Sequence, residues 1–256
     1  MKAWLFDAVA WWLTTLGGAA RYRDTATVVT PTLDDFPVDP ELEGEELAED
    51  YFAFVLEHAQ LRDEWAFEPE AEFTPNVADA LRGMPHAMTE APTRSGDEDW
   101  LPAGDPLPIP YDPSALERPA LLVATFARGI AHYLAQSDPE LPTGEAHRER
   151  LVDLGAVVLG FGIFLANTAF EFQQTSSGGM TGWGYDHRGA LGQVEVAYAL
   201  AIVATLLDFP DREVRAHLGP NPKAFYAAAR KDLDRHRGTD LAVLRAAPSS
   251  GHGPYR

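Results

Sequence analysis

Two long apolar stretches place the strongest constraint on how this chain folds. Residues 154–170 form a run of 17 uncharged residues, and residues 190–207 carry a single charged side chain, Glu195. The first run falls short of the ~20 residues that a membrane-spanning helix needs, and it also contains polar and glycine residues. We therefore expect two buried core helices that pack against each other. Three glycines of the first run are expected to allow their close approach: Gly155, Gly160 and Gly162.

Composition limits the classes of function. The 256 residues have a formal net charge of −19 and include no cysteine. An acidic surface repels phosphate backbones, so no nucleic-acid partner is expected. The lack of thiols excludes disulfides, thiolate zinc ligands and cysteine nucleophiles. The length predicts one globular domain over residues 1–245, followed by a flexible tail over residues 246–256.

The N-terminal stretch, residues 1–18, is apolar and contains three tryptophans. Asp7 interrupts this apolar stretch, which is unlike the uninterrupted core of a secretion signal. We expect a packed or surface-lying amphipathic helix here and a cytoplasmic protein, with membrane binding disfavoured by the acidic charge.

The remaining pattern is mostly helical with a small N-terminal β-sheet, so the fold class is mostly α (α+β). Apolar residues recur at helical spacing, and β-branched or alternating residues indicate short strands. Helices are predicted over residues 3–16, 45–60, 114–135 with a break near Arg118 and Pro119, 143–170, 190–207 and 222–237. Strands are predicted over residues 25–30, 65–73 and 107–111. Residues 31–44 and the glycine-rich residues 173–189 are predicted to be loops.

Chemistry is concentrated on the helix that contains the segment VATFARGIAHYL, residues 123–134. This segment resembles the helix of the H-E-x-x-H metallopeptidases, in which two histidines one turn apart bind zinc and the intervening glutamate activates water. In this chain Arg128 and Gly129 stand at the first histidine and the glutamate, and only His132 matches its position. A catalytic zinc centre is therefore not expected, and no catalytic residue is assigned.

The next helix contains Glu149 and Asp153, which lie one turn apart. In gluzincins, a following helix supplies a glutamate as third zinc ligand, and an aspartate four residues later supports a ligand histidine. The resemblance therefore implies a zincin-like helix pair in which Arg128, His132, Glu149 and Asp153 are the remaining site residues. If a metal binds at all, its ligands are expected to be His132 and Glu149.

The chain also resembles an uncharacterised bacterial family over residues 28–233. Matching segments include TPTLDDFP, LVDLGAVVLGFGIFLANTAF and GWGYDHRGALGQVEVAYALAI. The resemblance implies a common fold and supports the helix pair, but it implies no substrate.

Arg128 gives the most specific expectation. It lies one turn before His132, on the face that would meet Glu149 and Asp153. Two carboxylates near a buried face resist ionising together unless a cation lies between them. We therefore predict an ion pair from Arg128 to Glu149 or Asp153, with His132 hydrogen-bonded to the other carboxylate.

Other polar residues are weaker candidates. Trp183, Tyr185 and His187 form a mixture that occurs in binding loops and equally where ordinary loops are anchored. Within the apolar helices, Glu195, Asn167 and Gln193 must find hydrogen-bond partners if they are buried.

Three functions are compatible with these features of the sequence. The first is a catalytically inactive zincin-like protein, without a cofactor, that binds an unknown protein or small molecule. The second is a zinc-dependent hydrolase with a rearranged site on His132, Glu149 and Asp153, completed by His147 or His187. The third is a peripheral membrane protein that docks through its tryptophan-rich N-terminal helix.

Overall fold

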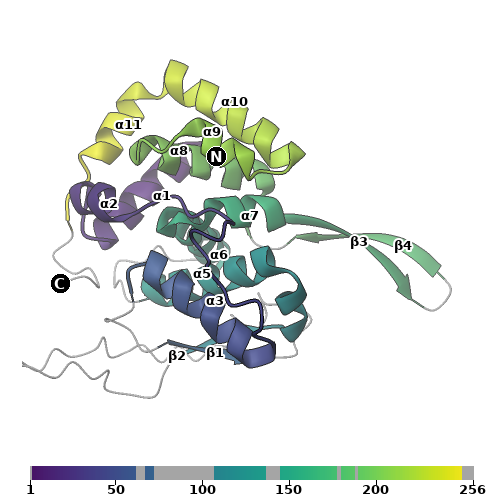
Figure 1. The fold of residues 1–256 in the computed structure, drawn as a ribbon. Coiled ribbons are helices and arrows are strands. Elements are labelled where there is room, and N and C mark those ends of the chain that lie inside the picture. Colours follow the sequence, from purple (N-terminus) through teal and green to yellow (C-terminus); the bar gives the residue numbers. More distant parts are fainter. Residues whose placement is uncertain are drawn as a thin grey trace, which may run out of the picture.

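The computed structural model describes residues 2–61, 67–71, 107–136, 145–177, 180–187 and 190–249, with backbone alone at 145–146 and 170–187. Helices dominate this part of the chain, and two small sheets accompany them (Figure 1). The helices are α1 (Lys2–Thr15), α2 (Ala19–Thr25), α3 (Gly44–His58), the short 3₁₀ helix η1 (Pro113–Glu117), α5 (Pro119–Gln136), α6 (Glu145–Ala156), η2 (Val157–Phe161), α7 (Gly162–Thr168), α8 (Gln193–Leu206), α9 (Asp211–Ala216), α10 (Pro220–His236) and α11 (Gly238–Arg245). The strands are β1 (Phe67–Ala71), β2 (Leu107–Tyr111), β3 (Phe170–Ser177) and β4 (Met180–His187).

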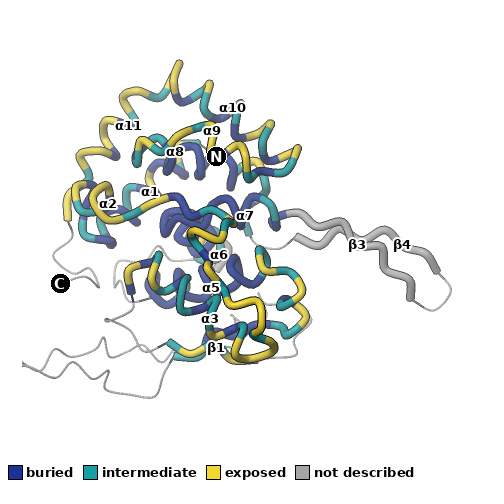
Figure 2. The backbone as a smooth tube through the Cα atoms, viewed as in Figure 1, coloured by how far each residue is buried: buried dark blue, intermediate teal, exposed yellow. Residues whose placement is uncertain are grey.

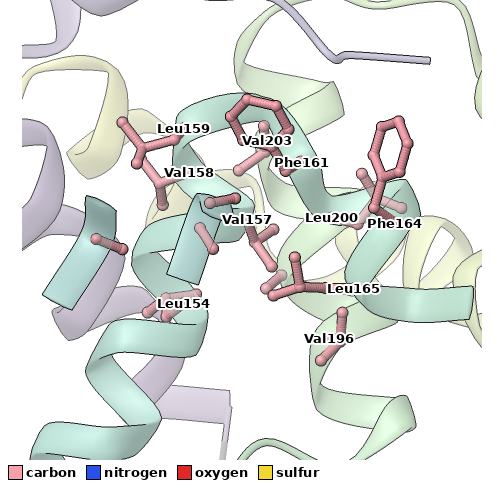
Figure 3. Packing of buried hydrophobic residues seen from close by; sticks show 14 of the residues in the cluster. Leu154, Val157, Val158, Leu159, Phe161, Phe164, Leu165, Val196, Leu200 and Val203 are labelled. Carbon is pink, nitrogen blue, oxygen red and sulfur yellow. The ribbon is translucent and has the colours of Figure 1, made fainter. Parts of the chain in front are cut away.

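The two apolar stretches form the centre of the core. The continuous run α6–η2–α7 packs against α5 on one side and α8 on another, and these segments are the most deeply buried ones (Figure 2). Leu165 of α7 and Leu200 of α8 belong to the shared apolar cluster (Figure 3). The predicted packing of the two stretches against each other is confirmed.

One continuous helix from His147 to Thr168 is long and apolar enough to cross a membrane, and 94% of its most apolar window is buried within the protein. Its environment is therefore that of a core helix.

The central helix is not regular. At Val157–Phe161 it widens into a π-helical turn, and Gly160 adopts a φ of 106°, which only glycine accepts without strain. Such a turn leaves carbonyl groups without their usual helical donors. The Tyr22 hydroxyl donates to the Val158 carbonyl at 2.6 Å, and the Val29 amide donates to the Gly160 carbonyl at 3.0 Å. The N-terminal 30 residues therefore complete the hydrogen bonding of the core helix.

Helix α1 is part of this core. Trp12 is fully buried, and its indole N–H donates to the Leu151 carbonyl of α6 at 2.9 Å. Gly155 lies directly against the Trp12 ring, which leaves no room for a side chain at that position.

The prediction for the three glycines needs correction. Only Gly162 lies at the contact with α8, where an added Cβ would come within 2.9 Å of Leu200 Cδ1. Gly155 instead faces α1, and Gly160 faces the Thr27 carbonyl.

The small sheet pairs β1 and β2 in parallel, with Phe67 opposite Leu107 and Ala71 opposite Tyr111. It lies beside α3 and α5 (Figure 1). The Tyr133 hydroxyl of α5 donates to the Pro108 carbonyl of β2 at 3.1 Å. The strand predicted over residues 107–111 and the helix break at Arg118 and Pro119 are confirmed.

Two local predictions are wrong. Residues 25–30 do not form a strand: Thr25 ends α2, and the following residues are extended without belonging to either sheet described here. Their β-branched side chains favour extended backbone, which here crosses the widened core helix rather than a neighbouring strand. The loop predicted over residues 173–189 is also wrong for its described parts, because residues 173–177 of β3 and residues 180–187 of β4 pair as antiparallel strands.

Candidate functional site

The site is built where α5, α6 and the start of α8 meet. Arg128 lies in the middle of α5, and Asp153 lies in the last turn of α6. Arg128 Nε is 2.7 Å from Asp153 Oδ1, and the two side chains are only 12% and 3% exposed. The predicted ion pair between these helices is confirmed, with Asp153 as the partner of Arg128. The Nε–H is not aligned for a hydrogen bond to this oxygen, so the contact is a close charge pair.

The second oxygen of Asp153 holds the segment that leads into α8. Asp153 Oδ2 accepts backbone N–H bonds from Ala190 at 2.6 Å and from Leu191 at 2.8 Å. Hydrogen bonds to a carboxylate are stronger than those between neutral groups. Asp153 therefore joins three parts of the chain: α5 through Arg128, its own helix, and the residues that precede α8.

A second ion pair lies one turn away on α6. Arg150 Nη2 is 2.7 Å from Glu195 Oε1, and the Glu195 carboxylate also accepts the Gly192 N–H at 3.0 Å. The Arg150 guanidinium lies 4.6 Å from the centre of the Trp4 ring of α1, a cation–π distance. Residues 150 and 153 are three apart and share a helix face, so both ion pairs anchor the start of α8.

Gly129 lies where the resemblance puts a catalytic glutamate. An added Cβ there would come within 2.6 Å of Ile109 Cγ2 on β2. The side of α5 next to Arg128 is therefore filled by the sheet, and it holds neither a base nor the space for one.

His132 lies one turn after Arg128 and is partly exposed. Its Nε2 atom contacts Nε2 of Gln136 on the same helix. Glu149 is also partly buried, and both residues have further interactions. The predicted bond between His132 and a carboxylate stays a prediction.

The polar residues within the apolar helices have structural partners. The Asn167 side chain donates to the His217 carbonyl and accepts the Gly219 N–H, both at 2.9 Å. The Gln193 amide donates to the Ala166 carbonyl at 3.0 Å. Their partners are backbone groups at helix ends, so these two side chains hold connections and do not line a cleft.

Two further predicted groups can be placed only in part. Trp183, Tyr185 and His187 occupy alternate positions of β4, opposite Gln174, Phe172 and Phe170 in the hairpin register. Their side chains lie outside the described residues, so their predicted role in binding stays a prediction. His147, proposed as an additional ligand, is exposed at the start of α6.

Sequence reasoning missed Arg150 as a site residue. Two features of the sequence could have identified it. Arg150 precedes Asp153 by three residues, and Glu195 is the single acidic residue of an otherwise apolar helix. A buried acid requires a cation, and Arg150 lies on the face that Asp153 already directs toward α8.

No group of three or more His, Asp or Glu residues close enough to hold a metal ion occurs within the described part of the chain. A scan against models of protein families, a search of curated proteins and a search of solved structures found no match to this chain.

Proposed function

We propose that this protein is a catalytically inactive, zincin-like binding module in which an arginine–aspartate pair takes the place of a metal centre. The observation that carries the proposal is the bonding of Asp153. One of its oxygens is held by Arg128 and the other by two backbone N–H groups. A carboxylate whose two oxygens both have partners holds the helix junction in place. Neither oxygen is then available to accept a hydrogen bond from a zinc-binding histidine.

The environment of Gly129 adds support. A metallopeptidase needs a general base near the metal-bound water. In this chain the position has no side chain, and Ile109 occupies the adjoining space. Both the charge and the base of the resembled site are thus replaced by features that stabilise the fold.

Two alternatives have less support. A rearranged zinc hydrolase on His132, Glu149 and Asp153 would require Asp153 to leave its present partners. Docking to a membrane through α1 would require its tryptophans to be free. However, Trp12 is buried, and Trp4 and Trp11 pack against the core. We place the protein in the cytoplasm, acting on a protein or small-molecule partner rather than on a peptide bond.

The proposal is tested by rebuilding a zinc site. Arg128→His restores the first histidine of the resembled motif, one turn before His132, and it frees one oxygen of Asp153 to support that histidine. Restoring the glutamate as well is ruled out as a first step, because Gly129→Glu would collide with Ile109. We expect Arg128→His to take up zinc at a ratio near one per chain and the wild type to take up none.

The matched control is Arg128→Gln, which removes the same charge without adding a ligand and should bind no zinc. Peptide hydrolysis by the wild type that is abolished by a chelator and by His132→Ala would overturn the proposal. Failure of a folded Arg128→His variant to bind zinc would show that the resemblance misplaces these residues.

A further inference from the structure

A second surface lies on the opposite side of the molecule from α3 and the small sheet, over α9 and α10 (Figure 1). A shallow hollow of about 440 Å³ opens there between the two helices. Three of the residues that line it are basic: Arg212, Arg215 and Lys223. This hollow is not part of the central site.

The basic residues of the hollow have few acidic partners within the part of the chain that the structure describes. Among the described residues, Arg215 and Lys223 form no ion pair, although acids outnumber bases 39 to 20 in the whole chain. Arg212 is 91% exposed, and its ion pair among the described residues is a long one of 3.9 Å to its neighbour Glu213. Two cations that form no ion pair with the described residues favour a locally positive potential on an otherwise acidic chain.

The one carboxylate in the hollow is already engaged. Asp211 Oδ1 lies 2.9 Å from Arg230 Nε and accepts the Tyr226 hydroxyl at 2.8 Å. Asp211 thus pairs with Arg230, which is not itself among the lining residues. The net charge of the lining residues is therefore positive and comes from Arg212, Arg215 and Lys223.

The surrounding charge selects the kind of partner. Residues 208–245 contain eight Lys or Arg and six Asp or Glu, so this region is mildly basic on a chain of net charge −19. A long polyanion such as nucleic acid, or an anionic membrane, would meet the acidic remainder of the surface and be repelled. A short acidic segment needs to match only the few cations of the hollow.

The shape of the hollow points the same way. It is open, and its cations are carried on long side chains, whereas small-molecule sites enclose most of their ligand. We infer that the α9–α10 hollow is a docking surface for a short acidic segment of a partner protein, held by Arg212, Arg215 and Lys223. This inference rests on the proposed role as a binding module and assigns it a surface.

The test uses a fluorescently labelled hexaglutamate peptide and the full-length protein, with binding followed by anisotropy. We expect saturable binding that weakens as salt is raised, because the contacts are exposed charges. The double variant Arg215→Glu with Lys223→Glu should weaken binding by at least about tenfold, since it inverts the local potential.

The matched control is Lys231→Glu with Arg235→Glu. These residues are exposed on α10, form no ion pair among the described residues, and lie outside the lining of the hollow. The control changes the net charge by the same amount. A difference between the two double variants therefore reflects where the charges lie and not the total charge. It should weaken binding by less than about threefold.

Circular dichroism establishes that each variant is folded, and neutral glutamine versions of both pairs serve if a reversal fails to fold. Absence of binding to the wild type, or equal losses in the two double variants, would overturn the inference. Displacement of the peptide by equimolar inorganic phosphate would also overturn it, because the hollow would then be a small-anion site. These variants leave Arg128 and Asp153 unchanged, so a negative result would not affect the zinc test.

Discussion

Two aspartates in this molecule, Asp153 and Asp232, each pair with cationic side chains of other helices, but their surroundings differ. Asp153 is almost completely buried, and it pairs with Arg128 and with two backbone N–H groups. Asp232 of α10 is 22% exposed and lies near Lys2, Tyr198, His236 and Arg237. Asp153 has the smaller number of charged neighbours, yet we expect it to matter more. Burial raises the cost of leaving a charge without a partner, whereas water replaces a lost partner at an exposed site.

The two sites also join different parts of the fold. Asp153 links α5 and α6 to the start of α8 and so fixes the centre of the core. Asp232 links the first residue of α1 to α8 and α10, because Lys2 Nζ lies 2.9 Å from its carboxylate and the Tyr198 hydroxyl donates to it at 2.6 Å. The contrast is between a pair that defines the core and a cluster that attaches the chain start to its surface.

The largest effect is expected for Arg128→Ala. Removal of this guanidinium leaves the Asp153 carboxylate buried without its cation, which should lower the free energy of unfolding by about 3–5 kcal/mol. Urea unfolding at neutral pH measures the loss. Arg212→Ala, at a side chain that is 91% exposed, is the control and should change the free energy by less than about 0.5 kcal/mol. Equal losses of stability for the two substitutions would show that burial does not determine how much each arginine contributes.

The packing beside Arg128 is tested by Gly129→Ala. The added methyl group collides with Ile109, and overpacking of this kind costs about 1–3 kcal/mol, although alanine is a better helix former than glycine. The double variant with Ile109→Ala should lose less stability than the sum of the two single changes, because the colliding atoms are gone. Simple additivity in thermal unfolding would mean that β2 does not close this side of α5.

A smaller effect is expected for Asp232→Asn. The hydrogen bond from Tyr198, followed by that from Lys2, lowers the pKa of Asp232 from 3.8 to about 2. A carboxylate with a lowered pKa stabilises the folded state above the unfolded pKa, and this contribution disappears as the pH falls through the folded pKa. At pH 7 the free energy of unfolding of the wild type should exceed that of Asp232→Asn by about 1 kcal/mol, because the site is partly exposed. The gap should close between pH 4 and pH 2 in urea unfolding curves. A gap that stays constant over this range would contradict the assigned cause.

The smallest effect is expected for Lys2→Ala. The Lys2 side chain is 37% exposed, and water can replace it beside Asp232. The loss should stay below about 0.5 kcal/mol and should shrink further as salt is raised. A loss comparable to that of Arg128→Ala would mean that the attachment of α1 depends on this contact rather than on Trp12.

The sequence predicted the helices that carry apolar periodicity and an ion pair from Arg128 to either Glu149 or Asp153. The resemblance to gluzincins singled out the two carboxylates, and helix geometry together with the need of a buried carboxylate for a cation pointed to Arg128. The short helices α2, α9 and α11 were missed, since six to eight residues show too little periodicity. Glycine-rich composition concealed the hairpin formed by β3 and β4.

The widened turn at Gly160 was also not predictable. An isolated glycine in an apolar run indicates close packing as readily as a break. Its conformation depends on the Tyr22 and Val29 donors, which lie more than 130 residues earlier in the chain. Likewise, the engagement of Asp153 by Ala190 and Leu191 depends on tertiary contacts that no local pattern encodes.

The central proposal is that Arg128 stands where a zincin would hold its metal ion. The most direct test is to incubate the wild-type protein with excess zinc, dialyse it exhaustively and measure its zinc content by inductively coupled plasma mass spectrometry. We predict that zinc stays far below one atom per chain and that Arg128→His under the same treatment retains it. One zinc per wild-type chain, lost on substitution of His132 by alanine, would contradict the account.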